Sequence, residues 1–160
     1  MSEAHNEHTY KRVTDFLAGS HIPFSVQEHE PFATSAQAAE VSGIDSADAM
    51  KSILLRSVGT YALAVLPASE RIDSRKMRNV LRSSQLRFAT PDEVISIMDC
   101  TPGRCHPFGV IDNLPTFVDR TISLKQNWYF NAGLNDRTLT IDYEDYMKVS
   151  GAQIVNLVHQ

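Results

Sequence analysis

The stretch AMKSILLRSVGTYALAVL, residues 49–66, decides the fold of this chain. It predicts two strands, Met50 to Ser57 and Tyr61 to Leu66, because both runs are rich in branched apolar residues and Gly59 marks a turn between them. Strands that are apolar at nearly every position are covered on both faces. We therefore expect this hairpin at the centre of a covered sheet or barrel.

Lys51 interrupts the apolar pattern near the start of the first strand. Its ammonium either reaches solvent, as snorkelling lysines do, or lies in a cleft at the strand end. A compact charge with three donors on a flexible stem suits the second use. Both interpretations stay open from Lys51 alone.

The composition is that of one globular domain spanning residues 1–160, in which we expect only residues 1–8 to be flexible. A net charge of -4 and a pI near 5.8 argue against a protein that coats DNA or another duplex. Positive charge does gather between residues 71 and 87. This run indicates either a solvated helix face or a local RNA contact.

The amino-terminal segment MSEAHNEHTYKR lacks the apolar core of a signal peptide, and no run approaches the roughly 18 apolar residues of a membrane span. We expect a cytoplasmic protein without a membrane partner. Cys100 and Cys105 are the two cysteines and the one pair available for a disulfide. Two cysteines in a chain with its own core do not make a secreted disulfide scaffold.

Helix and strand signals alternate along the rest of the chain. Helices are predicted from residue 9 to 18, and after the N-cap residues Thr34, Asp73, Thr90 and Asp142. Further strands are predicted at residues 22–29, 85–89, 116–118, 128–131, 138–141 and 153–158.

Thr101 to Gly109, TPGRCHPFG, is predicted to be a shaped loop because it holds two glycines and two prolines. Gly103 lets the backbone approach a ligand closely, while Pro107 fixes the shape of the loop. Such a loop can hold a small polar group with backbone donors. The alternative, a tight surface turn, is equally compatible with the composition.

Other kinds of chemistry have weaker support in the sequence. Cys105 and His106 suggest a thiol nucleophile with its base, but neighbours on an extended loop point apart and no third orienting group is evident. The histidines lack metal-ligand spacing, and two cysteines supply half of a structural zinc site. The chain also lacks a phosphate-binding GxxxxGK[ST] loop and a GxSxG elbow. We expect no metal and no cofactor.

Several segments carry a resemblance when they are taken together in order. They are PFATSAQAA (31–39), MKSILL (50–55), YALAVLPASERID (61–73), FATPDEV (88–94), GRCHPFG (103–109) and NAG (131–133). From about Ile22 to Ile154 the chain resembles the YbaK/ProX family. This family comprises the editing domain inserted in bacterial prolyl-tRNA synthetases and free-standing trans-editing deacylases.

The resemblance implies an α/β (α+β) fold with a mixed, barrel-like sheet wrapped by helices. It also implies hydrolysis of the ester that joins a wrong amino acid to tRNA, most often tRNA(Pro) carrying alanine or another small amino acid. The family lysine falls on Lys51, and the family GXXXP loop falls on Gly103 to Pro107. This correspondence favours the cleft interpretation of Lys51 over the snorkelling one.

The same resemblance implies roles for single residues. Lys51 is the catalytic candidate and holds the ester carbonyl or the terminal phosphate, while loop amides orient the ester. The implied substrate-binding residues are Gly103, Arg104, Cys105, His106, Pro107, Phe108, Gly109, Thr34, Ser35, Asn131 and Gly133. The implied partner is the acceptor end of a mischarged tRNA, with an aminoacyl-tRNA synthetase as a further candidate.

The loop departs from the commoner family pattern at Arg104, Cys105 and His106, where many relatives carry small or apolar residues. This departure leaves the amino acid open. It also leaves an alternative function: a non-catalytic regulatory or binding module of the same fold that senses an aminoacyl or other small-molecule ligand. Retention of Lys51 and the loop favours the deacylase.

Overall fold

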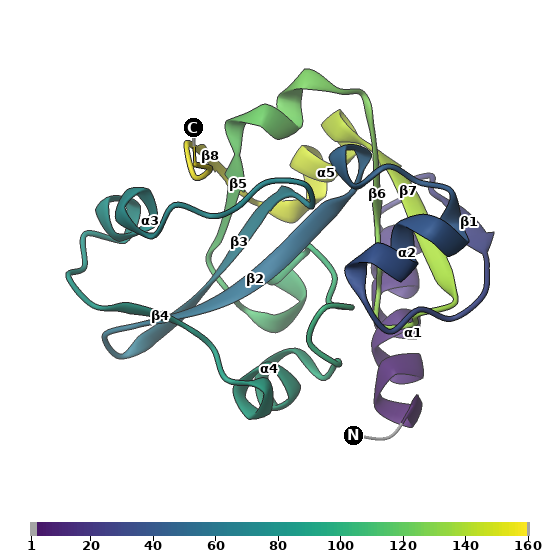
Figure 1. Cartoon of the computed structure of the whole chain (residues 1–160), viewed down its shortest axis with the longest axis horizontal. Coiled ribbons are helices and arrows are strands. Elements are labelled where there is room, and N and C mark those ends of the chain that lie inside the picture. The colour runs from purple at the N-terminus through teal and green to yellow at the C-terminus, as the bar shows by residue number, and fades with distance from the viewer. Residues whose placement is uncertain (1–2, 160) are drawn as a thin grey trace.

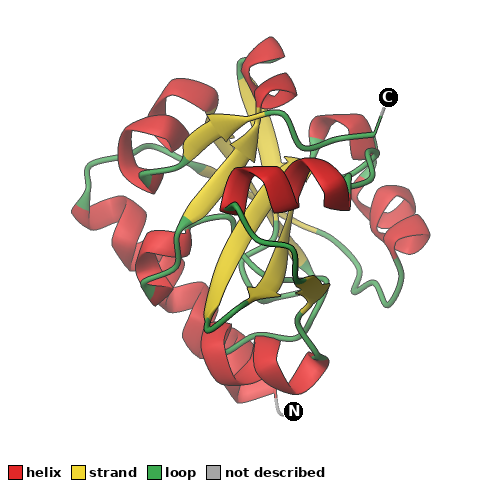
Figure 2. Cartoon of the chain, turned by 90° about the vertical axis from the view of Figure 1, so that its left-hand side faces the viewer, coloured by secondary structure: helices red, strands yellow, loops and turns green. Residues whose placement is uncertain are grey.

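The computed structural model describes residues 3–159 and consists of two β-sheets with helices around them (Figures 1 and 2). The helices are α1 (Glu3–Gly19), α2 (Ser35–Ser42), α3 (Ser74–Leu81), α4 (Pro91–Met98) and α5 (Tyr143–Ser150). The strands are β1 (Ser25–Glu28), β2 (Met50–Ser57), β3 (Thr60–Pro67), β4 (Leu86–Phe88), β5 (Thr116–Asp119), β6 (Asn127–Phe130), β7 (Arg137–Asp142) and β8 (Gln153–Val155).

The predicted hairpin is confirmed and lies within the larger sheet, whose strand order is β4-β2-β3-β5-β8. β2 and β3 are antiparallel, with Met50 opposite Pro67 and Ser57 opposite Thr60. β5 then joins β3 in parallel, and β8 joins β5 in parallel. The run from Ala62 to Leu66 in β3 is buried at every position, as expected of a strand that is covered on both faces.

The smaller sheet is antiparallel, in the order β1-β7-β6. It lies on the right in Figure 1, and an isolated parallel bridge between Ala49 and Tyr129 links it to the start of β2. The mixed α/β class is therefore confirmed. The barrel-like sheet is divided into two open sheets, and the seam between them runs along the amino-terminal half of β2.

Polar caps begin the helices where the sequence predicts them. Thr34, Asp73 and Asp142 accept backbone hydrogen bonds at the starts of α2, α3 and α5. At the start of α4, Thr90 and Glu93 form a complete capping box. These caps satisfy donors that the first turn of a helix leaves without partners.

The first helix begins at Glu3, six residues before its predicted start. Residues 3–8, which we expected to be flexible, are helical, whereas residues 1 and 2 lie outside the described part of the chain. Asn6 is fully buried, and its amide donates to Thr101 Oγ1 (3.0 Å) and accepts from the Thr101 N–H (3.0 Å). The prediction from apolar periodicity stopped short because polar contacts hold this end of the helix.

Two apolar clusters cover the two faces of the larger sheet. Leu63 and Val65 of β3 pack in the first cluster with Trp128, Phe130 and the other large aromatic side chains. Ala62, Ala64 and Leu66 face the second, smaller cluster beneath α3. The alternation along one strand is the ordinary period of two. No helix within residues 3–159 is long and apolar enough to cross a lipid bilayer.

Candidate active site

A cavity of about 430 Å³ lies where the two sheets meet. Its walls are the first half of β2, the end of β6, the inner side of α2 and α4, and the loop that follows α4. Lys51, Gly103, Cys105 and Asn131 all line it. The fold therefore brings together residues that are up to 80 positions apart in the sequence, from Lys51 to Asn131.

One wall of the cavity is an unpaired strand edge. β4 pairs with β2 at Leu55 to Ser57, and the Ala89 N–H donates to the Leu54 carbonyl (2.9 Å). Backbone groups alternate between the two edges of an antiparallel strand. Ser52 is two residues before Leu54, so its N–H and C=O point toward the same edge, where the cavity lies. This edge therefore presents backbone donors and acceptors to the cavity.

Lys51 is half-buried in the cavity wall. Burial and repulsion from Arg71 lower the pKa of its ammonium, and attraction to Glu70 opposes this shift. A partly desolvated lysine with another cation nearby gains from an incoming anion or carbonyl oxygen, which replaces the lost hydration. This environment differs from that of a fully solvated surface lysine.

The opposite wall, residues 101–109, is held in place at several backbone atoms. The Ser52 hydroxyl donates to the carbonyl of Cys105 (2.8 Å), and the Gly133 N–H donates to the carbonyl of Arg104 (2.7 Å). The buried Tyr146 hydroxyl donates to the carbonyl of Pro107 (2.9 Å). Three segments that are far apart in the sequence thus hold the carbonyl groups of residues 104, 105 and 107.

A buried polar chain supports the loop from behind. The Phe108 N–H donates to His106 Nδ1 (3.1 Å), so the ring proton is on Nε2, which donates to Asp112 (3.0 Å). Arg12 of α1 binds the other oxygen of Asp112 (2.7 Å). Burial opposes the charge on Asp112, yet the hydrogen bonds from His106 and Arg12 hold the pKa of this carboxyl below its usual range. His106 therefore joins the Phe108 backbone to Asp112 through its two ring nitrogens.

The sequence profile of the aminoacyl-tRNA editing domain matches residues 29–149. This chain belongs to the aminoacyl-tRNA editing family. The matched segment contains β2, the loop and Asn131, so it includes the whole cavity wall described above.

Two known proteins and one solved structure align with most of this chain. The "Multifunctional Ser/Thr-tRNA deacylase ProXp-y" of Escherichia coli K12 is 23% identical over 153 residues, which are 92% of each chain. The "Prolyl-tRNA editing protein ProX" of Acetoanaerobium sticklandii is 24% identical and covers 80% of this chain and 82% of its own. A crystal structure described as a proposed trans-editing enzyme for prolyl tRNA synthetase superposes with a TM-score of 0.82 at 22% identity, covering 95% of this chain and 98% of its own.

The structure separates the predicted site residues of this editing domain into two groups. Lys51, Gly103, Cys105 and Asn131 line the cavity. The remaining predicted residues with described side chains are outside the lining: Thr34, Arg104, His106, Pro107, Phe108, Gly109 and Gly133. Within the second group, the Gly133 N–H donates to the Arg104 carbonyl, and Arg104 forms an ion pair with Glu3 of α1 (3.1 Å), so both contacts hold the residue between Gly103 and Cys105.

Three of the outer residues are buried in the core. His106 and Phe108 are fully buried, and Phe108 packs among Phe16, Phe130 and Tyr146. Gly109 is also buried, and a Cβ there would lie 1.9 Å from Thr116 Oγ1. This side of the loop faces the core. The glycines and prolines of the TPGRCHPFG segment predict a loop but not the direction of its side chains.

Thr34 lies outside the cavity lining, whereas the side chain of Ser35 is outside the described part of the structure. Thr34 is exposed, and its hydroxyl accepts the Gln37 N–H (3.2 Å) as the N-cap of α2. Ser35 is the first residue of this helix. The side of α2 that reaches the cavity begins one turn later, with Ala38 and Ala39. The TSAQAA segment therefore contributes through its small residues.

Sequence reasoning missed further residues of the cavity wall. Ser52 is the most informative, because it joins β2 to the loop through its hydroxyl. Its polarity within an otherwise apolar strand was an available signal. Phe88, Met98 and Phe130 are wall residues of distant elements. Local patterns carry no information about these contacts.

Cys100 and Cys105 form a disulfide in the editing domain. In this state Cys105 carries no thiol, which removes the nucleophile required by the Cys105–His106 alternative. His106 is moreover engaged with Phe108 and Asp112. Among residues 3–159, His, Cys, Asp and Glu side chains form no group of three that is able to hold a metal ion.

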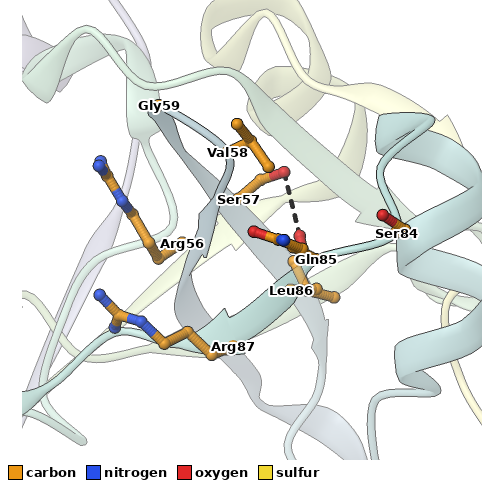
Figure 3. A pocket seen from close by; sticks show the side chains of 8 residues that line it. All are labelled: Arg56, Ser57, Val58, Gly59, Ser84, Gln85, Leu86 and Arg87. Atoms are coloured by element: carbon orange, nitrogen blue, oxygen red, sulfur yellow. Dashed lines mark hydrogen bonds between the residues drawn. The ribbon is translucent and has the colours of Figure 1, made fainter.

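A second hollow, of about 570 Å³, lies beyond the cavity at the β2–β3 turn (Figure 3). Arg56 and Arg87 are direct cross-strand partners, and their side chains extend on the same side in Figure 3. Arg87 binds Glu93 (2.7 Å), whereas the Arg56 guanidinium lies 4.4 Å from the centre of the Tyr61 ring.

Hydrogen bonds from Arg87, Thr90 and Tyr61 hold the pKa of Glu93 well below its usual range. This hollow contains no residue of the 101–109 loop, so it is not the candidate catalytic site.

Proposed function

We propose that this chain is a cytoplasmic trans-editing deacylase that hydrolyses the ester of mischarged tRNA, with tRNA(Pro) carrying alanine or another small amino acid as the substrate. The observation that carries the proposal is the position of Lys51. Lys51 lines the same cavity as Gly103 and Cys105 of the loop, and its ammonium is partly desolvated. The names of the relatives, a Ser/Thr-tRNA deacylase and a prolyl-tRNA editing protein, support the same class of reaction.

In the proposed reaction, the cavity positions an ester that is already activated. Lys51 binds the carbonyl oxygen or the terminal phosphate, and backbone N–H groups of the loop bind the charge that develops on the oxygen when water adds. The bond to the ribose oxygen then breaks, and that oxygen takes up a proton as the amino acid leaves. Positioning and hydrogen bonds to a developing oxyanion are recognised sources of rate for acyl transfer.

The cavity walls favour a small amino acid. Met98 and Phe130 are almost completely buried wall residues, and the disulfide fixes Cys105 on the loop side. Part of the 430 Å³ must accommodate the terminal ribose, since the reacting ester is on it. The proposal of a small amino acid therefore depends on these closely packed walls and not on the total volume of the cavity.

We further propose that the tRNA acceptor strand leaves the cavity along β2. Arg56 is five residues beyond Lys51, or about 17 Å along the strand at the ~3.4 Å rise of an antiparallel strand, and its side chain is on the other face of β2. It forms no ion pair within residues 3–159, so its charge remains available for a phosphate. Its neighbours in the second hollow, Ser84 and Gln85, add polar groups (Figure 3).

The test is a panel of tRNAs charged with alanine, serine, threonine or proline, incubated with the purified protein and with Lys51→Ala. We expect rapid loss of alanine or serine from tRNA(Pro), retention of proline, and loss of the activity in the variant. Tight binding of these tRNAs without hydrolysis would favour the non-catalytic module instead.

A further inference from the structure

The disulfide joins the core to the substrate loop of the candidate site. Cys100 follows α4 and is fully buried, whereas Cys105 is partly exposed in the cavity wall. Their Cα atoms are 5.8 Å apart, within the range that a disulfide requires. The bond closes a ring over Thr101 to Arg104, which includes Gly103 of the cavity.

We propose that Cys100 and Cys105 form a reversible redox modification site, whose oxidation by a small-molecule disulfide of the glutathione type orders the substrate loop. This proposal rests on the proposed function for its effect on catalysis, although the modification itself does not depend on that function. In a reducing compartment, Cys100 and Cys105 are ordinarily present as two thiols. The disulfide form then marks oxidising conditions.

The exchange begins at Cys105, because this sulfur borders the cavity while Cys100 is shielded by the core. The Cys105 thiolate attacks one sulfur of the small disulfide, and one small thiolate leaves and takes up a proton. The Cys100 thiolate next attacks the Cys105 sulfur and releases the second small thiol. Two protein thiols are oxidised to one disulfide, while one small disulfide is reduced to two thiols.

Cys100 is the fixed partner of the pair. The carbonyl of the preceding residue, Asp99, accepts a hydrogen bond from the buried Thr9 hydroxyl, and the following N–H, of Thr101, donates to Asn6 (3.0 Å). Both anchors belong to α1. Reduction of the disulfide therefore leaves Cys100 in place, and the gain in mobility is at the Cys105 end of the ring.

Gly103 and the side chain of Cys105 gain most of this freedom. Gly103 has φ +90°, and no atom lies within 4 Å of the point where a Cβ would be, so no neighbour confines it. Arg104 and Cys105 keep their carbonyl contacts with Gly133 and Ser52. The reduced loop thus stays folded but loses the constraint on the amides that face the ester. Opening the short ring lets the backbone N–H donors of the loop move out of position, which slows the reaction. We expect about a tenfold lower kcat/KM for the reduced protein.

The experiment uses the full chain equilibrated in oxidised and reduced glutathione buffers. Free thiols are counted by maleimide mass tagging, hydrogen exchange is followed for the amides of residues 101–108, and deacylation of alanyl-tRNA(Pro) is measured at both redox states. We expect no free thiol and slow exchange in the oxidised buffer, and two free thiols, faster exchange and the roughly tenfold lower rate in the reduced one. The double variant Cys100→Ala, Cys105→Ala should show one rate in both buffers.

Two outcomes would overturn the proposal. One is a disulfide that reduces only when the whole chain unfolds, as judged by circular dichroism, since this would make it a purely structural bond. The other is a pair of interconvertible forms with equal loop exchange and equal rates. If neither form hydrolyses any mischarged tRNA while thiol count and loop exchange respond as expected, the redox site stands and the proposed function fails. These readouts on the parent protein remain decisive even if the double variant does not fold.

Discussion

Ser52 holds the carbonyl of Cys105 in place: Ser52 Oγ lies 2.8 Å from this oxygen and 2.9 Å from the carbonyl oxygen of His106. One hydroxyl of an otherwise apolar strand thereby fixes two consecutive peptide units of the loop. The contact sets the distance between the Lys51 strand and the backbone donors opposite it. It is the link between the two halves of the candidate site.

Replacing Ser52 by alanine should show whether this hydrogen bond affects catalysis more than it affects the stability of the fold. We expect a loss of about 1 kcal/mol in unfolding free energy and about a tenfold loss in kcat/KM, because the loop shifts relative to Lys51. Urea unfolding and deacylation assays measure the two effects. Ser57→Ala is the matched control, since Ser57 is on the same strand and donates to Gln85 at 3.3 Å, away from the loop. Equal activity losses in both variants would argue against a positioning role.

Lys51→Ala removes a charge-assisted contact of about 1.5 to 3 kcal/mol, so deacylation should slow roughly tenfold to over a hundredfold. Thermal stability should change little or rise, because the ammonium is partly desolvated in the folded protein. Lys51→Arg should restore only part of the rate, since a planar guanidinium does not place a compact charge at the same point. Lys148→Ala, at an exposed position of α5, serves as the control. A folded Lys51→Ala protein with the parent rate on every substrate would end the proposal.

The lowered pKa of Lys51 gives the reaction a pH dependence. The ammonium is present below this pKa and is lost as the pH rises through it, so kcat/KM should fall on the alkaline side. This fall should begin below the pH of about 10.4 at which an ordinary lysine titrates. Rates are corrected for spontaneous ester hydrolysis at each pH. Lys51→Arg should lack the alkaline fall, because its guanidinium stays charged, and an identical fall in this variant would assign the titration to another group.

Gly103→Ala tests the loop conformation. Gly103 has φ +90°, and Gly59 in the β2–β3 turn has φ +69°; at both positions the space that a Cβ would occupy is free of neighbours within 4 Å. Both alanine variants should therefore lose about 1 to 2 kcal/mol through backbone strain alone. We expect a large loss of deacylation only at Gly103, which lines the cavity. Matching melting temperatures with unchanged activity in both would make Gly103 an ordinary turn residue.

His106 is expected to act on stability through its two ring nitrogens. In His106→Asn, the side-chain oxygen replaces Nδ1 as acceptor for Phe108 but does not reach Asp112, and the loss should be about 1 to 3 kcal/mol. His106→Leu also leaves the buried Phe108 N–H without a partner and should cost about 1 to 3 kcal/mol more. Chemical unfolding of both variants measures the difference. Equal stabilities would show that the Phe108 contact contributes nothing.

The candidate site was only partly predictable, and the reason differs between residues. Lys51 stood out because it interrupts an apolar strand, and Gly103 stood out by composition. His106 looked like a chemical group because of its residue type, although its ring is directed into the core toward Asp112. Side-chain direction in an irregular loop depends on which neighbour packs against it, and no period in the sequence reports that neighbour.

The sequence by itself determined the β2–β3 hairpin, the capped helices α2 to α5 and the existence of the loop, because these follow from local propensity, capping and the period of burial. Only the tertiary structure decided that the sheet splits along β2, that α1 begins at Glu3, and that Ser52, Cys100 and Gly133 fix the loop. These features depend on contacts between segments far apart in the chain. Such contacts form when the apolar faces pack together, and packing brings polar partners within reach that local sequence cannot identify.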